Sequence, residues 1–383
     1  MKPCWLFVDS FPVFGGHEVM LLRLMAELSS QGRIRPRLLA RRECRLYERG
    51  RDYLTPDSFA PRPPGRPGLW SRMAWAWRDG LAFLRTVTRL RPALCVVAEN
   101  CLLSQALFVG LARLLGVRVI VYVPLVDTFA AMGFRWARLR DWLVRHGYAQ
   151  LPDAWLTITP EQAHAFARWA KVRRPIHTLP NTVAPAIEAL AQVPLPPHPT
   201  NHGRLRVLVL GRLEPFQKGL DLLLDHIETA SLPPGLTIAL VGDGPYAEEI
   251  QRRQRHNPAL AGIVSLRPWS DPARVMGEHD LLLLPSRFEG VPLVMLEAMA
   301  LGLPVVASDL PGTRAYLPET CLFPVGDLGA AFAIIQRLAV HEEERRAITD
   351  TNRRTFTARA SGAAFAAAVA QLAEQLTLEL AHS

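Results

Sequence analysis

Two glutamates in an otherwise apolar stretch are the first residues whose types and spacing could do chemistry. The segment SRFEGVPLVMLEA, residues 286–298, places Glu289 and Glu297 eight residues apart, directly after Leu281–Leu284. The leucine run predicts a buried strand, RFEG a tight loop, and VPLVMLEAMALG a helix that ends before Pro304. Glu289 then lies in the loop and Glu297 about two turns into the helix, at 3.6 residues per turn.

The start of this helix is a predicted anion site. The first N–H groups of a helix lack intrahelical partners, and the helix dipole adds a positive field there. A diphosphate would satisfy the N–H groups of Gly290, Val291, Leu293 and Val294. Glu297 could then accept hydrogen bonds from a ribose, and Glu289 could reach a sugar beyond the phosphates. Taken singly, each has a simpler interpretation: Glu289 as a partner of the helix dipole, and Glu297 as a surface residue.

A basic loop, LVLGRLEPFQKG, is the second feature. Its strand should end at Gly211, and Arg212 and Lys218 precede a helix that opens at Gly219. Of the 44 basic residues only three are lysines, so a lysine here favours a need for a compact, mobile charge. The pair suits a diphosphate, with a solvated surface pair as the alternative.

A glycine turn, VGDGPYAEEI, is the third feature. Gly242, Gly244 and Ala247 fit the dinucleotide pattern G-x-G-x-x-A after a strand. Pro245 interrupts the pattern, and no acidic residue follows at a strand end about 20 residues later. We therefore predict a nucleotide-facing turn at Gly242 and no nicotinamide cofactor.

The elements that must position these loops alternate along the chain. Short, wholly apolar runs such as ALCVVAE, LRVLVLG and HDLLLLPS predict strands covered on both faces, and helical segments separate them. The fold class is therefore α/β, with two doubly wound Rossmann-like domains facing each other across a cleft, where ligands bind beyond the carboxyl ends of the strands. Prolines between positions 180 and 199 place a linker at 185–203, between domains 1–184 and 204–358. The final helix, 359–383, should pack back toward the first domain.

Composition limits the possible classes. The chain has 383 residues, 49% hydrophobic and 21% charged, which is typical of a globular protein. No run of about 18 apolar residues predicts a membrane span, and the N-terminus is a poor signal peptide. Five scattered cysteines favour reduced thiols over zinc or disulfides. Residues 1–190 carry 27 basic against 14 acidic side chains, so the first domain should face an anionic partner.

Together, GRLEPFQKG, VGDGP and PSRFEGVPLVMLEAMALGLPVVASDLPG resemble the retaining glycosyltransferases of family 4, which have the GT-B fold. The resemblance is dense over about residues 204–325. In the first domain, Gly15 and Gly16 match a glycine-rich loop, and LPNTV precedes the linker. The resemblance implies that the second domain binds a nucleotide-sugar and the first binds the acceptor. It assigns Arg212 and Lys218 to the diphosphate, Glu297 to the ribose and Glu289 to the transferred sugar.

The resemblance also concerns metals and cofactors, and this chain departs from the family pattern at some positions. No metal and no cofactor are expected, because the basic pair and the helix start offset the charge of the leaving diphosphate; a UDP-sugar is favoured over a GDP-sugar. Family members often carry a His near the sugar, where this chain has Pro124, with Tyr122 and Asp127 nearby. His17 could replace it or be structural. Pro292 removes one N–H donor.

Two segments of the first domain combine arginine with tryptophan. GLWSRMAWAWRDGLAFLRTVTRLRP spans Trp70 to Arg89, and FRWARLRDWLVRH contains Arg135, Arg138, Arg140 and Arg145 with Trp136 and Trp142. Basic helices with aromatic anchors suit an anionic membrane surface, although such helices also pack on sheets. No nucleic-acid module is recognisable.

These observations predict an enzyme, a retaining hexosyltransferase. It would move a sugar from a nucleotide diphosphate-sugar to a membrane-associated glycan or lipid-linked acceptor in surface polysaccharide assembly. It should be cytoplasmic, and could be peripheral on the inner face of the cytoplasmic membrane. Two alternatives remain: a GT-B nucleotide-sugar epimerase, and a catalytically inactive GT-B partner protein.

Overall fold

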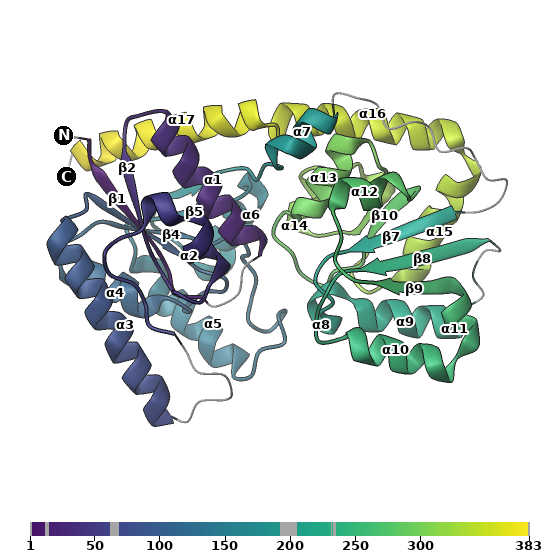
Figure 1. The fold of residues 1–383 in the computed structure, drawn as a ribbon, viewed down its shortest axis with the longest axis horizontal. Coiled ribbons are helices and arrows are strands. Elements are labelled where there is room, and N and C mark those ends of the chain that lie inside the picture. The colour runs from purple at the N-terminus through teal and green to yellow at the C-terminus, as the bar shows by residue number, and fades with distance from the viewer. Residues whose placement is uncertain are drawn as a thin grey trace. The chain divides into compact units, whose positions relative to one another are not determined.

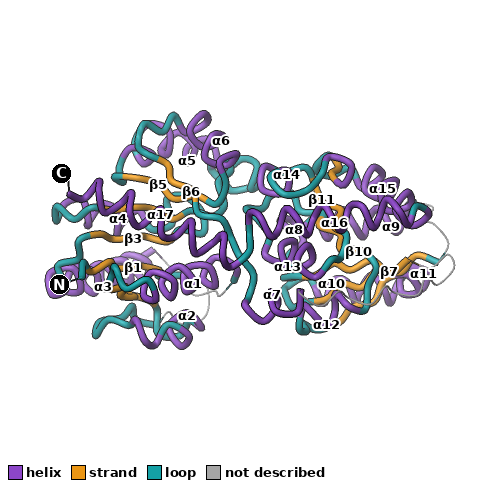
Figure 2. Tube along the Cα trace, turned by 90° about the horizontal axis from the view of Figure 1, so that it is seen from above, coloured by secondary structure: helices purple, strands orange, loops and turns teal. Residues whose placement is uncertain are grey.

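The computed structural model describes residues 2–11, 15–61, 69–191, 205–230, 232 and 235–381, with the side chains of 69–72, 380 and 381 outside the description. The chain forms two compact units. One consists of Met1–Pro180 with Ala366–Ser383, and the other of Asn181–Phe365. In Figure 2, helices flank the strands of each unit.

The first unit is built on a six-stranded parallel sheet of order β2-β1-β3-β4-β5-β6 (Figure 1). Its strands are β1 (Cys4–Asp9), β2 (Arg35–Ala40), β3 (Leu94–Ala98), β4 (Val119–Tyr122), β5 (Ala154–Thr157) and β6 (Ile176–Thr178). Its helices are α1 (Gly16–Ser30), α2 (Arg45–Arg49), α3 (Leu69–Leu90), α4 (Ala106–Leu114), α5 (Ala137–His146) and α6 (Pro160–Ala170). Every residue of β1, β3, β4 and β5 is buried, as strands covered on both faces require.

The second unit has a six-stranded parallel sheet of order β12-β11-β10-β7-β8-β9. Its strands are β7 (Leu205–Leu210), β8 (Leu236–Val241), β9 (Val264–Arg267), β10 (Leu281–Leu284), β11 (Val305–Ser308) and β12 (Leu322–Phe323). Its helices are α7 (Pro185–Ala191), α8 (Pro215–Lys218), α9 (Leu220–Thr229), α10 (Ala247–His256), α11 (Pro258–Ile263), α12 (Pro272–Gly277), α13 (Leu293–Leu301), α14 (Pro311–Arg314), α15 (Leu328–Val340) and α16 (Glu342–Arg359). Short 3-10 turns occupy Arg51–Tyr53, Tyr148–Gln150 and Glu319–Cys321.

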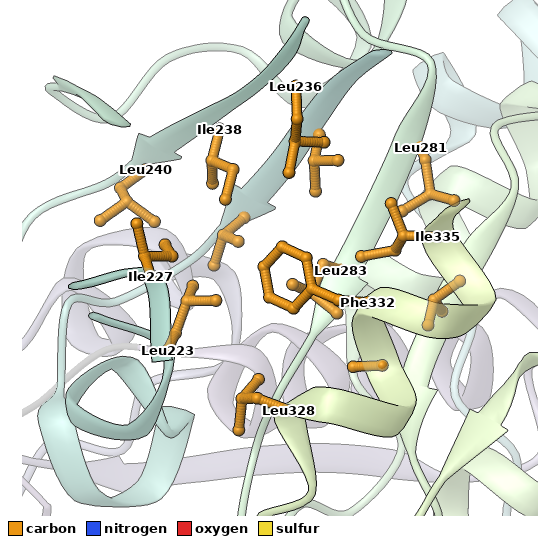
Figure 3. Packing of buried hydrophobic residues seen from close by; sticks show 14 of the residues in the cluster. Leu223, Ile227, Leu236, Ile238, Leu240, Leu281, Leu283, Leu328, Phe332 and Ile335 are labelled. Atoms are coloured by element: carbon orange, nitrogen blue, oxygen red, sulfur yellow. The ribbon is translucent and has the colours of Figure 1, made fainter. Parts of the chain in front are cut away.

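One face of the second sheet packs on α9 and α15. Leu223 and Ile227 of α9 and Phe332 and Ile335 of α15 meet the side chains of β8 and β10 in one buried cluster (Figure 3). The apolar residues of both helices recur at intervals of three or four, which places them on one face. This packing holds the carboxyl ends of β7, β8 and β10 at one edge.

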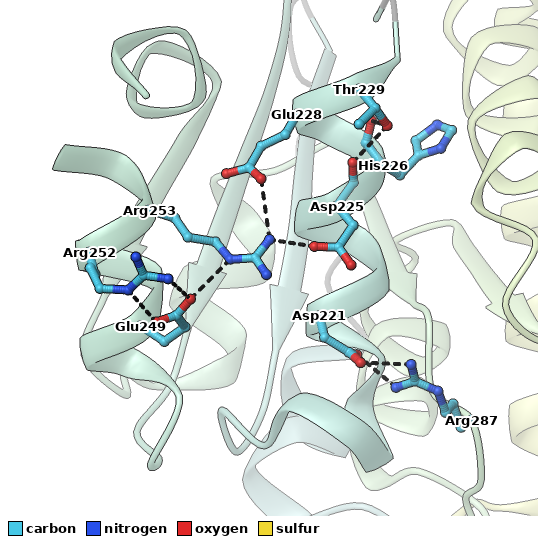
Figure 4. Close-up of polar contacts among 9 residues, drawn as sticks. All are labelled: Asp221, Asp225, His226, Glu228, Thr229, Glu249, Arg252, Arg253 and Arg287. Atoms are coloured by element: carbon cyan, nitrogen blue, oxygen red, sulfur yellow. Dashed lines mark hydrogen bonds and ion pairs between the residues drawn. The ribbon is translucent and has the colours of Figure 1, made fainter. Parts of the chain in front are cut away.

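The outer side of α9 is tied to α10 by charge. Arg253 of α10 lies between three carboxylates, 2.5 Å from Asp225, 3.3 Å from Glu228 and 3.2 Å from Glu249 (Figure 4). Arg252 shares Glu249 with it. These pairs lie at the surface, where each contributes little, so the apolar cluster carries most of the stability of this layer.

The predicted fold class is confirmed as α/β with two Rossmann-like units. The first residues of the predicted linker form α7, and 192–203 lie outside the described residues. The helix predicted from Val291 begins two residues later, because Pro292 occupies the N-cap, and it ends at Gly302 in the left-handed conformation, φ 85°. The final helix, α17 (Gly362–Ala381), contacts the first unit, where Gln31 donates to the carbonyl of Ala366.

Candidate functional site

The order of the second sheet creates a topological switch point between β7 and β10. From β7 the chain moves outward to β8 and β9, then returns to β10 on the other side of β7. The loops that follow β7 and β10 therefore leave the sheet in opposite directions, and such a switch point is where α/β sheets bind ligands. The two predicted motifs, 211–219 and 285–292, are these two loops.

Glycine allows the two loops to touch. Gly219 ends α8 with φ 65°, and a Cβ there would lie 2.0 Å from the carbonyl oxygen of Pro285. On the other side of β7, Gly242 has φ 150°, and a Cβ there would lie 1.8 Å from the carbonyl oxygen of Gly211. Side chains at these positions would force the loops apart, so glycine is required by close approach as well as by φ.

Lys218 and Glu289 join the two loops. The ammonium of Lys218 forms an ion pair with Glu289 Oε1, and Ser286 Oγ donates to the same oxygen at 3.1 Å. The side chains are 21% and 11% exposed, so the pair is shielded yet reachable. The sequence motifs placed these two residues on one ligand, and the structure brings them into direct contact.

Arg287 forms a further tie that the sequence interpretation missed. Its guanidinium donates to both carboxylate oxygens of Asp221 at 2.7 Å (Figure 4). It also donates to the carbonyl of Phe216 at 2.7 Å. It also lies 4.6 Å from the centre of the Phe216 ring. Burial alone would raise the pKa of Asp221, but the hydrogen bonds from Arg287 lower it below its ordinary value. In the sequence, the only signal for this contact was the position of Arg287, two residues before Glu289.

The start of α13 is open to an anion. Its N-cap is Pro292, no side chain caps it, and Leu293 and Val294 precede the first bond, from Met295 N to the carbonyl of Pro292. Asn181 of the LPNTV segment holds the carbonyl of Val291 at 2.9 Å. Gly290 is fixed from the other side, because a Cβ on Gly312 would lie 1.6 Å from its carbonyl oxygen. The loop is thus supported on both sides.

The remaining predicted residues are placed less directly. Arg212 is exposed and donates to Gln217 Oε1 at 3.1 Å, inside its own loop. Glu297 is half-buried on α13. Gly15 and Gly16 belong to the first unit, where Gly15 is the N-cap of α1 and its N–H donates to Glu18 Oε2 at 2.7 Å.

The first unit has its own switch point, between β1 and β3, and a histidine lies there between two carboxylates. His17 Nε2 is 3.7 Å from Asp9 Oδ2, and Nδ1 is 3.1 Å from Glu18 Oε1. Burial opposes the imidazolium, yet both carboxylates raise the pKa of His17 above its ordinary value. Burial raises the pKa of Asp9 to about 6. The His17 ring also lies 5.9 Å from that of Tyr122, two residues before Pro124.

These three side chains fit an ion pair better than a metal ion. Their ligand atoms lie within 4.8 Å of one another. Asp9 and Glu18, however, face different nitrogens of one imidazole, so a single ion cannot replace both contacts. The raised pKa of His17 therefore favours its imidazolium form at the edge where the sheet ends.

Glu99 is a further buried acid at this edge, in addition to Asp9 and Glu18. One oxygen accepts from Tyr148 at 2.6 Å and from the N–H of Gln105 at 2.9 Å. Burial outweighs these bonds and raises the pKa of Glu99 to about 7. Sequence reasoning assigned no role to Asp9 or Glu99, although each ends or follows a wholly apolar strand.

Comparison with known proteins finds similarity in the second unit. Residues 204–340 match the family Glycosyl transferases group 1. Sulfoquinovosyl transferase SQD2 of Arabidopsis thaliana is 31% identical over 148 residues, and the amylovoran biosynthesis glycosyltransferase AmsK of Erwinia amylovora is 29% identical over 155. Each alignment covers 37% of this chain, and 28% and 38% of those proteins respectively.

The similarity in structure extends over nearly the whole chain. Anabaena HepE, solved with UDP-glucose, aligns with a TM-score of 0.71 and 19% identity over 98% of this chain and all of that one. Sucrose-phosphate synthase from Thermosynechococcus elongatus gives 0.73 and 17%, over 99% of this chain and all of that one. The fold is therefore that of the GT-B glycosyltransferases. Within the described residues, no helix is both long and apolar enough to cross a bilayer.

Proposed function

We propose that this protein is a retaining glycosyltransferase of family 4 that uses a nucleotide diphosphate-sugar. The observation that carries the proposal is the contact between Lys218 and Glu289 at the β7/β10 switch point, within residues that match the glycosyl transferases group 1 family. A cation, a carboxylate and an uncapped helix start at one switch point suit a ligand with a diphosphate and a polyhydroxylated sugar.

Each residue then has a chemical task. Lys218, Arg212 and the first N–H groups of α13 would bind the diphosphate and offset the charge that develops when it leaves. Glu297 would accept hydrogen bonds from the ribose, and Glu289 would face the transferred sugar. The bond between the sugar carbon and the phosphate oxygen breaks, and the acceptor oxygen bonds to that carbon on the same face. The acceptor proton passes to the leaving phosphate oxygen, so no separate base is needed.

The first unit would bind the acceptor. We propose a glycan or lipid-linked acceptor at the inner face of the cytoplasmic membrane, and a UDP-sugar as the donor. Two observations support this choice. Solved neighbours contain UDP and UDP-glucose, and one relative, 30% identical over 109 residues, is an Escherichia coli galactosyltransferase acting on GlcNAc-diphosphoundecaprenol. His17, in the first turn of α1 and 5.9 Å from the ring of Tyr122 at the end of β4, would stand in for the histidine that Pro124 replaces.

The test compares donor binding with turnover. Calorimetry with UDP, GDP and their sugars would identify the base, and release of nucleoside diphosphate would measure transfer. Lys218→Ala and Arg212→Ala should each lower activity by about one to two powers of ten, because a charge-assisted contact contributes roughly 1.5–3 kcal/mol. Lys171→Ala, which removes an exposed lysine of the first unit, is the matched control.

Wild-type turnover in Lys218→Ala would refute this assignment. Conversion of the donor into another nucleotide-sugar without acceptor would identify an epimerase instead. Binding of no nucleotide at all would favour the inactive partner protein.

A further inference from the structure

Helix α5 of the first unit turns its apolar stripe toward solvent. Leu139, Trp142 and Leu143, spaced as one helical face, are all exposed, and the Trp142 side chain is 54% exposed. Trp136, just before the helix, is 74% exposed, and Phe134 adjoins it. An amphipathic helix in a globular unit normally buries such a stripe, whereas the described residues leave this one exposed.

The opposite face of α5 explains how the helix is held. Val144 is its only buried residue. Asp141 accepts the N–H of Phe129 at 2.9 Å, and the Arg140 guanidinium lies 5.4 Å and 5.1 Å from the rings of Phe129 and Phe134. Arg140 therefore serves the unit itself and is not a free surface charge, unlike its role in the sequence prediction. With polar and small residues turned inward, the apolar stripe is presented outward.

The backbone at Trp136 reinforces this orientation. It has φ 60° and ψ 30°, the left-handed conformation, which is unfavourable for a bulky aromatic residue. The Trp136 side chain buries little surface in the unit, and strain of this kind is typical of functional positions.

The charge around the stripe is basic. Arg135, Arg138 and Arg145 are exposed, and among the described residues none of the three forms an ion pair. Asp141, the acid of the helix, faces inward. Apolar anchors of Trp and Leu surrounded by unpaired arginines match the interface of an anionic bilayer, where tryptophan lies at headgroup level.

We propose that α5 and the turn before it dock on an anionic lipid bilayer, with Trp136 and Trp142 inserted at the interface and the three arginines on the headgroups. The surface is independent of the donor site. It follows β4 in the chain, so docking would bring the carboxyl edge of the first sheet, with Gly15 and His17, near the membrane. A lipid-linked acceptor would then meet this edge without leaving the bilayer.

The experiment is co-sedimentation of the full chain with phosphatidylglycerol-containing vesicles and with neutral phosphatidylcholine vesicles. Wild-type binding should need the anionic lipid and weaken steeply with added salt, because the attraction falls off over about 10 Å at 0.1 M salt. The variant R135Q/R138Q/R145Q should bind about two powers of ten more weakly, since each basic residue near the surface contributes about fivefold. W136S/W142S should also lose binding.

Trp269→Ser is the matched control, because Trp269 is 61% exposed in the second unit, outside the stripe, and should leave vesicle binding unchanged. UDP affinity should persist in all variants, which separates this proposal from the donor site. Equal binding of wild type and both stripe variants would overturn the proposal. So would absence of wild-type binding, or a wild-type dimer that the stripe variants convert to monomer, since the stripe would then contact protein.

Discussion

Gly219 tests directly whether the close approach of the β7 and β10 loops shapes the site. Gly219→Ala places a methyl 2.0 Å from the Pro285 carbonyl oxygen and keeps a left-handed backbone, φ 65°. Gly326→Ala is the matched control: its φ is 86°, but its Cβ would meet only Leu222 Cδ1, at an ordinary 3.7 Å. Both variants carry the strain of the left-handed conformation, and only Gly219→Ala adds the clash.

The two contributions can be separated by magnitude. The left-handed conformation costs about 1–2 kcal/mol for a residue with a Cβ. Overpacking adds typically about 1–3 kcal/mol. At about 2–4 °C per kcal/mol for a domain of this size, Gly326→Ala should lower the Tm by about 5 °C and Gly219→Ala by about 10 °C.

Thermal unfolding measures the loss of stability in each variant, and calorimetry measures the affinity for UDP. Only Gly219→Ala should weaken the binding of UDP. The carbonyl of Pro285 must move in this variant, and this movement would carry Glu289 away from Lys218. Equal losses of stability and unchanged UDP affinity in both variants would refute the close approach as the feature that positions the site.

Three further predictions concern single side chains. Glu297→Gln should weaken the binding of UDP itself, whereas Glu289→Gln should reduce turnover and leave UDP affinity unchanged. Calorimetry that shows the reverse pattern would mean that the two glutamates have each other's roles. Burial raises the pKa of Glu99 from 4.5 to about 7, so its stabilising protonated form is lost as pH rises through about 7. The unfolding free energy of wild type relative to Glu99→Gln should fall by about 3 kcal/mol between pH 4.5 and pH 8; a flat difference would contradict this. Arg287→Ala should lower stability by about 1–2 kcal/mol and weaken UDP, while Arg314→Ala, which removes an exposed bidentate pair, should do neither measurably.

The sequence by itself determined the elements and the positions of the donor motifs. Wholly apolar runs such as Leu281–Leu284 predict doubly covered strands, because burial on both faces leaves no polar alternation. Glycines after a strand, such as Gly211, indicate a loop, and Pro292 with Gly302 bounds a helix by local sterics. These signals depend on neighbours in the chain, so they are readable without the fold.

The tertiary structure alone decided which side chains meet. Lys218 contacts Glu289, and Arg287 contacts Asp221, because β10 lies beside β7, a pairing set by packing between segments far apart in sequence. The burial of His17 likewise depends on tertiary packing, because its ring lies 5.9 Å from that of Tyr122 at the end of β4. The spacing of Leu139 and Trp142 was compatible with a buried helix face, and only the packed unit shows that the described residues leave that face exposed. Periodicity specifies that a face is apolar, whereas what covers that face is settled by the rest of the chain or by a partner.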